Sequence, residues 1–360
     1  MKRTLIAAAA LALSAGAVQA QNVTLYGLID AGVERLDHVG AGDDTLYRMP
    51  TIAGSAASRW GLRGSEDLGG GLKAVFTLES GFGADSGVMQ QGNRLFGRQA
   101  FVGLSSDWGT VSLGRQYSML LLGSLSTDLF LAQIYGAGAF DLFLAGPRVD
   151  NALAYQGKFG GLTLGALYSL GRDANTCAGE RGIGRECHAW SAVAKYDASL
   201  WGVAAWIDEQ RGLQGGANTP PTANLAHLTD QRAAVNGYVM LGKTKLAANY
   251  MRRDNETAAP ALQKSTLWSL AVAHPLTDSL TFEAQYYDFA FKDNDNDGKM
   301  LALRATYAFS KRTAAYVTLG ALSNDGAAQF SPSVGLSGTA QAPAPGENQT
   351  GVMAGLRHAF

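Results

Sequence analysis

Most of this chain consists of segments of about ten residues in which apolar and polar side chains alternate. A period of two places successive side chains on opposite faces of a β-strand. In NVTLYGLIDAGVER, for example, Val23, Leu25 and Ile29 share one face, and Tyr26 and Asp30 share the other. We count sixteen such segments, many of them joined in pairs by short turns such as SSDWG and GKFGG.

The pairs are separated by longer polar loops, and no second apolar layer is left to cover the apolar faces of the strands. In lipid, strands satisfy every backbone group only by closing into a barrel. Short turns on one side and long loops on the other are typical of outer-membrane barrels. The sequence therefore predicts an all-β fold, a transmembrane antiparallel β-barrel of 16 strands over 21–360, with an open aqueous lumen. The expected long loops are 171–187, 210–231, 255–264, 291–299 and 323–347.

The amino terminus has the organisation of a signal peptide. Lys2 and Arg3 precede a short apolar run and the small-residue cleavage signal VQA. We expect residues 1–20 to be removed by cleavage between Ala20 and Gln21. The mature chain then carries 27 basic and 30 acidic residues, a formal net charge of −3. That balance gives no support to nucleic-acid binding.

Two cysteines, Cys177 and Cys187, occur in the Gly-rich, charged stretch GRDANTCAGERGIGREC. In an exported protein this pair predicts a disulfide that closes a small loop. Metal binding is the weaker interpretation, because only His188 is nearby and the chain has no further cysteine.

The segment 116–147 interrupts the alternation for about thirty residues. Its only charged side chains are Asp128 and Asp141. It is too apolar for disorder, and loops of this length within compact folds are usually functional. The segment alone leaves three arrangements open: a loop folded into a lumen, a buried helical insertion, or a loop packed against another subunit. The flanking strands favour the first.

Several motifs together resemble the Gram-negative general porins, and best their beta-proteobacterial, anion-preferring branch: VTLYGLIDAG, SRWGLRGSEDLGGGLKAVFTLESGF, RQAFVGLSSDWGTVSLGRQY, RVDNALAYQGKFGGLTLGALYSLG and the final GLRHAF. The resemblance covers essentially the whole mature chain. It implies a homotrimer of sixteen-stranded barrels in the cell outer membrane, with 116–147 as the inward-folded third loop. It also implies passive transport of small anionic and neutral solutes, without a cofactor.

The expected surroundings follow from the same resemblance. Outer-membrane lipid and lipopolysaccharide would contact the barrel. The carboxy-terminal Phe360 resembles the signal read by the barrel-assembly machinery.

The resemblance further implies an arginine ladder on the barrel wall that faces acidic residues of the loop. Alternation supports an inward Arg59, because Trp60 takes the lipid face. Arg115 shares its face with Leu113, so only a bulge or a strand end would turn it inward. The alternative for each arginine is a side chain that extends to the membrane interface. A ring of fixed positive charge favours anions. The matching positions are Arg59, Arg98, Arg115 and Arg148, with Asp128 and Asp141 as the expected acidic partners.

One acidic stretch resembles the start of a calcium-binding loop. KDNDNDGK places Asp293, Asp295 and Asp297 before Gly298, as in an EF-hand. The twelfth position is Arg304, where a bidentate glutamate is required. We therefore expect a solvated acidic loop, with weak binding of a divalent cation or bridging of lipopolysaccharide as the alternative.

Enzymatic activity is not expected. A hydrolytic barrel needs a nucleophile and a base on one face, and the nearest serine pairing, His188 with Ser191, takes opposite faces. Two alternatives remain on the same barrel, a substrate-specific channel for organic acids or sugars and an adhesin. Aromatic residues near strand ends predict girdles at the membrane interfaces. They are Tyr155, Tyr168, Trp190, Tyr196, Trp201, Trp268, Tyr307, Phe309 and Tyr316.

Overall fold

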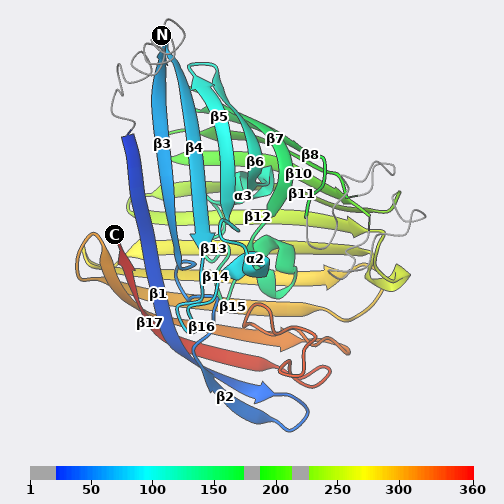
Figure 1. Cartoon of the computed structure of the whole chain (residues 1–360). Helices are drawn as coiled ribbons and strands as arrows, with labels where there is room; N and C mark the ends of the chain where they lie inside the picture. Colours follow the sequence, from blue (N-terminus) through cyan, green and yellow to red (C-terminus); the bar gives the residue numbers. More distant parts are fainter. Residues whose placement is uncertain (1–21, 174–186, 213–226) are drawn as a thin grey trace, which may run out of the picture.

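The barrel closes through its first strand. The computed structural model describes residues 22–173, 187–212 and 227–360. Strand β1 (Asn22–Val39) pairs antiparallel with β3 (Arg59–Gly69) along one part of its length and with β17 (Gln349–Ala359) along another. Figure 1 shows β1 in blue beside β17 in red. All other neighbours in the barrel are antiparallel and follow chain order, so the prediction of a sixteen-stranded barrel is confirmed.

The remaining wall strands alternate between short turns and longer loops. They are β4 (Leu72–Gly81), β5 (Gln99–Ser106), β6 (Gly109–Tyr117), β7 (Arg148–Phe159), β8 (Leu162–Ser169), β9 (Ala189–Asp197), β10 (Trp201–Arg211), β11 (Thr229–Leu241), β12 (Thr244–Asn255), β13 (Lys264–Pro275), β14 (Leu280–Phe291), β15 (Gly298–Ala308) and β16 (Thr313–Asn324). The first loop holds an additional short strand, β2 (Asp44–Arg48), which pairs with the end of β1 and was not expected. The loops also contain α2 (Gln90–Asn93) and η5 (Pro260–Leu262).

Alternation places apolar side chains on the outside of the barrel. Along β8, Leu164 and Tyr168 are exposed, whereas Thr163 and Ser169 are buried on the lumen side. Most of the expected girdle aromatics are exposed or half-buried, but Tyr316 is not. It is buried in the lumen, because its neighbour Val317 takes the lipid face of β16.

A β-bulge turns Arg115 into the lumen, as its position after Leu113 required. The pairing of β6 with β7 shifts register between Gly114 and Gln116. Gly114 has a φ of +131°, which is accessible to glycine and strained for other residues. Between these pairs β6 advances by two residues and β7 by three, so the extra residue lies in β7 opposite Arg115, and the local twist of the bulge re-aims the Arg115 side chain.

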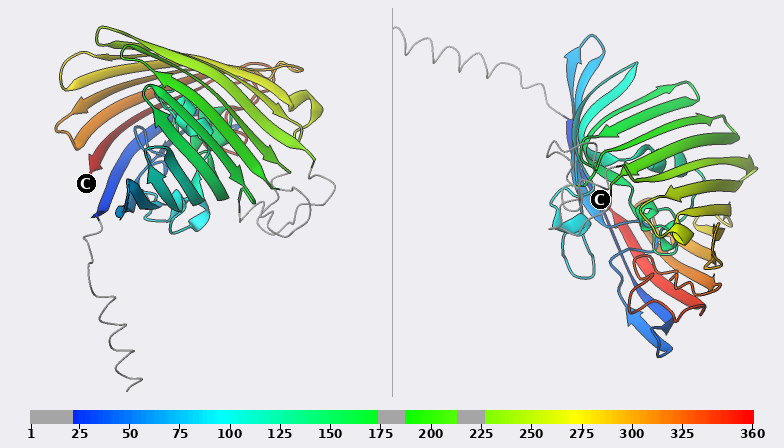
Figure 2. Two further views of the ribbon diagram at one scale, coloured as in Figure 1. Left: turned by 90° about the horizontal axis from the view of Figure 1, so that it is seen from above. Right: turned by 90° about the vertical axis from the view of Figure 1, so that its right-hand side faces the viewer.

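The segment 118–147 folds into the barrel and packs on the inner face of the wall, which confirms the first of its three arrangements. It contains α3 (Met119–Ser124), η1 (Ala137–Ala139) and η2 (Leu142–Ala145), and it lies within the curve of the sheet in the two views of Figure 2. The opposing wall is unusually apolar for a lumen, which explains the apolar sequence of the loop. Its buried side chains include Trp206, Met251, Leu267, Met300 and Met353.

Close packing and hydrogen bonds fix the loop against this wall. Gly123 lies against Trp206, where an added Cβ would approach the indole ring to 2.2 Å, so only glycine fits there. Side chains from the wall bond to the loop at many points: Ser191 to Met119, Asn236 to Gly123, Lys195 to Ser126, Gln285 to Leu129, Arg304 to Leu129 and Gln133, and Glu34 to Tyr135.

Several expectations concern other parts of the chain. Cys187 is buried and is not a free thiol; Cys177 lies outside the described residues, as do Ala20 and Gln21, so the disulfide and the cleavage site stay predictions. No helix among the described residues is long and apolar enough to cross a membrane.

The acidic side chains before β15 do not converge in this structure. Among the described residues no three histidine, cysteine or acidic side chains come together as a possible metal-binding group, so Asp293, Asp295 and Asp297 form no such cluster. Instead, the carboxylate of Asp297 accepts a hydrogen bond from the backbone of Phe291 (2.9 Å) and shapes the loop.

Candidate functional site: the arginine-lined constriction

Two of the predicted ladder arginines meet at Tyr117. Arg98 donates from Nη2 to the Tyr117 hydroxyl (2.6 Å), and Arg148 donates to the same oxygen (2.9 Å). The guanidinium of Arg148 also lies over the tyrosine ring, 4.5 Å from its centroid, in cation–π geometry. Tyr117 ends β6 and Arg148 begins β7, so the two ends of the inward loop are held together by this contact.

The other two ladder arginines are paired with wall carboxylates. Arg59 lies 3.6 Å from the buried Glu79, which also accepts from Nε of Arg98 (2.7 Å). The bulge brings Arg115 onto Asp150. The structure thus places all four predicted arginines on the lumen side of β3 to β7.

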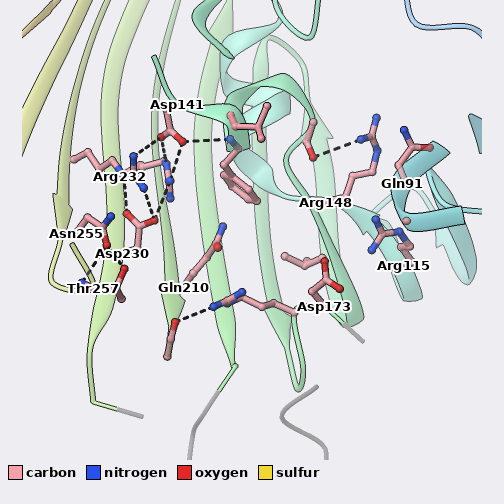
Figure 3. Close-up of a pocket in the computed structure, with 18 of the residues that line it drawn as sticks. Gln91, Arg115, Asp141, Arg148, Asp173, Gln210, Asp230, Arg232, Asn255 and Thr257 are labelled. Atoms are coloured by element: carbon pink, nitrogen blue, oxygen red, sulfur yellow. Dashed lines mark hydrogen bonds and ion pairs between the residues drawn. The ribbon is translucent and has the colours of Figure 1, made fainter. Parts of the chain in front are cut away.

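Neither loop carboxylate forms an ion pair with these four arginines among the described residues. Asp141 instead pairs with Arg232, at 2.5 and 3.1 Å, and with Arg253 at 3.5 Å (Figure 3). Burial alone would raise the pKa of Asp141, but the two guanidinium groups hold it well below its usual range. Asp141 is therefore an anchor of the loop on β11 and β12.

Our sequence reasoning missed Arg232 and Arg253, although a signal was present. In β11 the exposed residues Val235 and Val239 have odd numbers, and the buried residues Ala234 and Asn236 have even numbers. The same alternation places Arg232 in the lumen, where its side chain is almost fully buried.

Asp128 contacts the wall through Tyr287, whose hydroxyl donates to its carboxylate (2.7 Å). Part of the surface of Asp128 is exposed, but its carboxylate is closely surrounded by protein atoms. This burial raises the pKa of Asp128 to about 6, although the hydrogen bond from Tyr287 acts in the lowering direction. Asp128 lines a gap of only about 10 Å³ between loop and wall.

This raised pKa predicts a pH dependence of loop docking. The pKa of Asp128 is near 3.8 in a released loop and about 6 in the docked loop. At pH values between these two, Asp128 carries a proton only when the loop is docked, so docking weakens as the pH rises through this range. Hydrogen–deuterium exchange of loop peptides, corrected for intrinsic rates, should be faster at pH 7.5 than at pH 4.5. Asp128→Asn, which keeps the acceptor for Tyr287, should remove the difference; Asp278→Asn, in a turn, should retain it. Equal exchange at both pH values in the wild type would contradict the prediction.

Two cavities lie on either side of the Tyr117–Arg148 contact. The cavity on the loop side has a volume of about 660 Å³ and is lined by Arg115 and Arg148 together with Arg232 and Asp141; Figure 3 shows these side chains converging from opposite walls. The cavity on the turn side has a volume of about 350 Å³ and is lined by Tyr117. Arg148 lines the first cavity and Tyr117 the second, so their contact lies between the two cavities.

Positive charge exceeds negative charge at this contact. Among the described residues, Arg148 has no carboxylate oxygen within 4.0 Å. The ion pairs that surround it join four further arginines to three carboxylates, so five arginines face three acids. They are Arg59, Arg94, Arg98 and Arg115, with Glu79, Asp150 and Asp173.

A comparison with protein families matches residues 7–327 to the family described as Gram-negative porin. The chain belongs to this family. The porin is 32% identical to outer membrane porin protein 32 of Delftia acidovorans over the full length of both chains. It is 44% identical to an outer membrane porin protein of Bordetella pertussis over 47% of this chain and 48% of that relative.

The solved structure of the anion-selective porin from Comamonas acidovorans superimposes on this porin with a TM-score of 0.77 at 26% identity, covering 94% of this chain and all of that one. These relatives are porins, which are channels and not enzymes. The protein is an outer-membrane porin, and its short turns therefore face the periplasm while its long loops face outward.

Proposed function

We propose that this general diffusion porin prefers anions, and that the preference arises between the loop 116–147 and the arginines Arg59, Arg98, Arg115 and Arg148. The observation that carries the proposal is Arg148, which lies between the two cavities against Tyr117 and has no carboxylate partner among the described residues. The net charge of the chain is not the cause, because the mature sequence is slightly acidic.

Short distances make this local charge effective. At about 4 Å, two unit charges interact by roughly 4 kcal/mol at an effective dielectric constant of about 20, and by roughly 1 kcal/mol in bulk water. In the wider parts of the lumen, salt screens charges beyond about 10 Å at 0.1 M. The similar Comamonas structure is described as anion-selective, which supports the same assignment.

The test is a reversal potential measured in a planar bilayer across a potassium chloride gradient. We expect the sign that corresponds to chloride carrying most of the current, and a larger potential at low salt because screening is weaker there. A reversal potential of the opposite sign would mean that the arginine assignment is wrong.

We predict that the porin is a homotrimer, as the family resemblance implies. The eight residues of β5 rise about 27 Å along the strand, and a tilt of about 45° leaves only about 19 Å across the membrane, less than the usual apolar band of about 25 Å. A neighbouring subunit would cover this low part of the wall, where Val102 and Leu113 are exposed. The similar OmpT of Vibrio cholerae is described in a trimer form.

Unheated electrophoresis in mild detergent should show a species near three times the chain mass that dissociates on boiling. A monomer that stays stable and conducting in light-scattering and bilayer measurements would contradict the trimer.

We also propose that Phe360 is read by the barrel-assembly machinery and that residues 1–20 are removed after export. Phe360 exchanges two backbone hydrogen bonds with Gly27, at 3.0 and 3.1 Å, where the barrel closes. Its side chain is exposed on the outside of the barrel, as a recognition signal requires.

A further inference from the structure

The short helix α3 is apolar on both of its faces. Met119 and Leu120 are buried against the barrel wall. On the opposite face, Leu121, Leu122 and Leu125 follow the i, i+1, i+4 spacing that places side chains together on a helix. Leu125 is 57% exposed. A helix with one face in water normally carries polar residues there, so this leucine face calls for a functional explanation.

The leucine face forms one side of the cavity on the turn side of the constriction. Leu121, Leu122 and Leu125 all line that cavity, whose volume is about 350 Å³. The side across from them consists of the lumen faces of β5, β6 and β7, which carry mostly polar side chains together with Phe101 and Ala154. The polar lining residues are Gln99, Thr110, Ser112, Gln116, Tyr117 and Gln156.

The cavity on the loop side repeats this division. Its apolar side again comes from the inward loop: Leu142, which is 63% exposed, lies there with Phe143. Its polar side carries Arg94, Arg115 and Arg148. A solute that passes from one cavity to the other therefore meets apolar side chains of the inward loop in both, next to the Asp141–Arg232 ion pair in the loop-side cavity.

We propose that this porin selects organic anions that have an apolar side, such as aromatic and short aliphatic carboxylates, over polyhydroxylated anions with the same number of carbons. The carboxylate would be passed along the guanidinium groups of Arg115 and Arg148, which line the loop-side cavity and match its geometry. The hydrocarbon part would lose water against the leucines. A polyol would place hydroxyl groups against Leu121, Leu122 and Leu125, whose side chains offer no hydrogen-bond partner. The inference rests on the proposed anion preference and names its substrate class.

The test compares potassium hexanoate with potassium gluconate, which have equal carbon numbers, in bi-ionic reversal-potential measurements on the full-length porin. One buried CH₂ group is worth roughly a fourfold preference, so we expect hexanoate to be favoured by roughly fourfold or more beyond the ratio of the free-solution mobilities. A hexanoate-to-gluconate permeability ratio equal to the ratio of their free-solution mobilities would overturn the inference.

Variants separate the leucine face from simple size effects. Leu121→Gln with Leu125→Gln keeps the side-chain volume similar, and it should bring the hexanoate preference close to the mobility ratio. Leu125→Gln alone, at an exposed position, should give an intermediate value and protects the test against misfolding of the double variant. Leu262→Gln, in an outer loop that lines neither cavity, is the matched control. A preference that persists in the double variant would overturn the inference.

A chloride–potassium measurement on the same channels distinguishes the two proposals. If the wild type prefers potassium, the proposed anion preference has failed, and this inference fails with it. If it prefers chloride but treats hexanoate and gluconate according to their mobilities, only the inference about apolar anions has failed.

Discussion

Arg148→Gln should lower the anion-to-cation permeability ratio on the order of tenfold, since a single charge at a narrow site changes ion energies by about 1 kcal/mol or more. The side chain lies at the constriction without a carboxylate partner among the described residues, so its replacement removes a full positive charge. Glutamine can still donate to Tyr117. The conductance should change less than the selectivity, because the loop still sets the width of the lumen.

Reversal potentials at two salt concentrations check this prediction, with the larger shift expected at the lower one. The matched control is Arg312→Gln, which changes an exposed turn residue far along the chain from the constriction strands and outside both cavities. An unchanged reversal potential in the Arg148 variant would place this side chain outside the ion path.

Arg59 and Arg98 make a less direct test than Arg148. Both contact the buried Glu79, so replacing the pair with serine leaves that carboxylate with Tyr26 as its hydrogen-bond donor. A shift toward cations is expected in this double variant as well. The size of this shift, however, combines the loss of two positive charges with the exposure of the negative charge of Glu79.

Asp141→Asn should release the part of the inward loop that precedes β7. Asp141 is the buried partner of Arg232 and Arg253, and removing one member of a buried ion pair typically costs about 3–5 kcal/mol. Asp230 remains bonded to both arginines, at 2.9 and 2.8 Å, so the barrel wall itself should stay intact. We expect brief openings of higher conductance and a broader distribution of single-channel currents.

Single-channel recording on the variant tests this, and unheated electrophoresis confirms that the barrel still folds. Asp278→Asn, which alters an exposed turn, should behave like the wild type. Steady currents of wild-type amplitude in the Asp141 variant would show that the apolar packing of Phe140 and Leu144 is sufficient to hold the loop.

The sequence by itself determined the barrel and its inside and outside, because the side-chain period of a strand is a local property. Alternation along its strand assigns Leu164 to lipid, and the outward face of Leu113 required a bulge or a strand end at Arg115. Tyr316 was expected in the girdle, and the structure places it in the lumen. The composition of 116–147 likewise indicated burial, although it did not name the wall that receives the loop.

Only the tertiary structure decided which charges meet. Asp141 and Arg232 are separated by 91 positions in the chain, and their contact depends on where the loop lies against β11. The same placement leaves Arg148 with a tyrosine instead of a carboxylate and turns three leucines of α3 toward the lumen. Alternation assigns each residue to a face of one strand, whereas pairing across a lumen depends on the packing of all the strands and of the loop together.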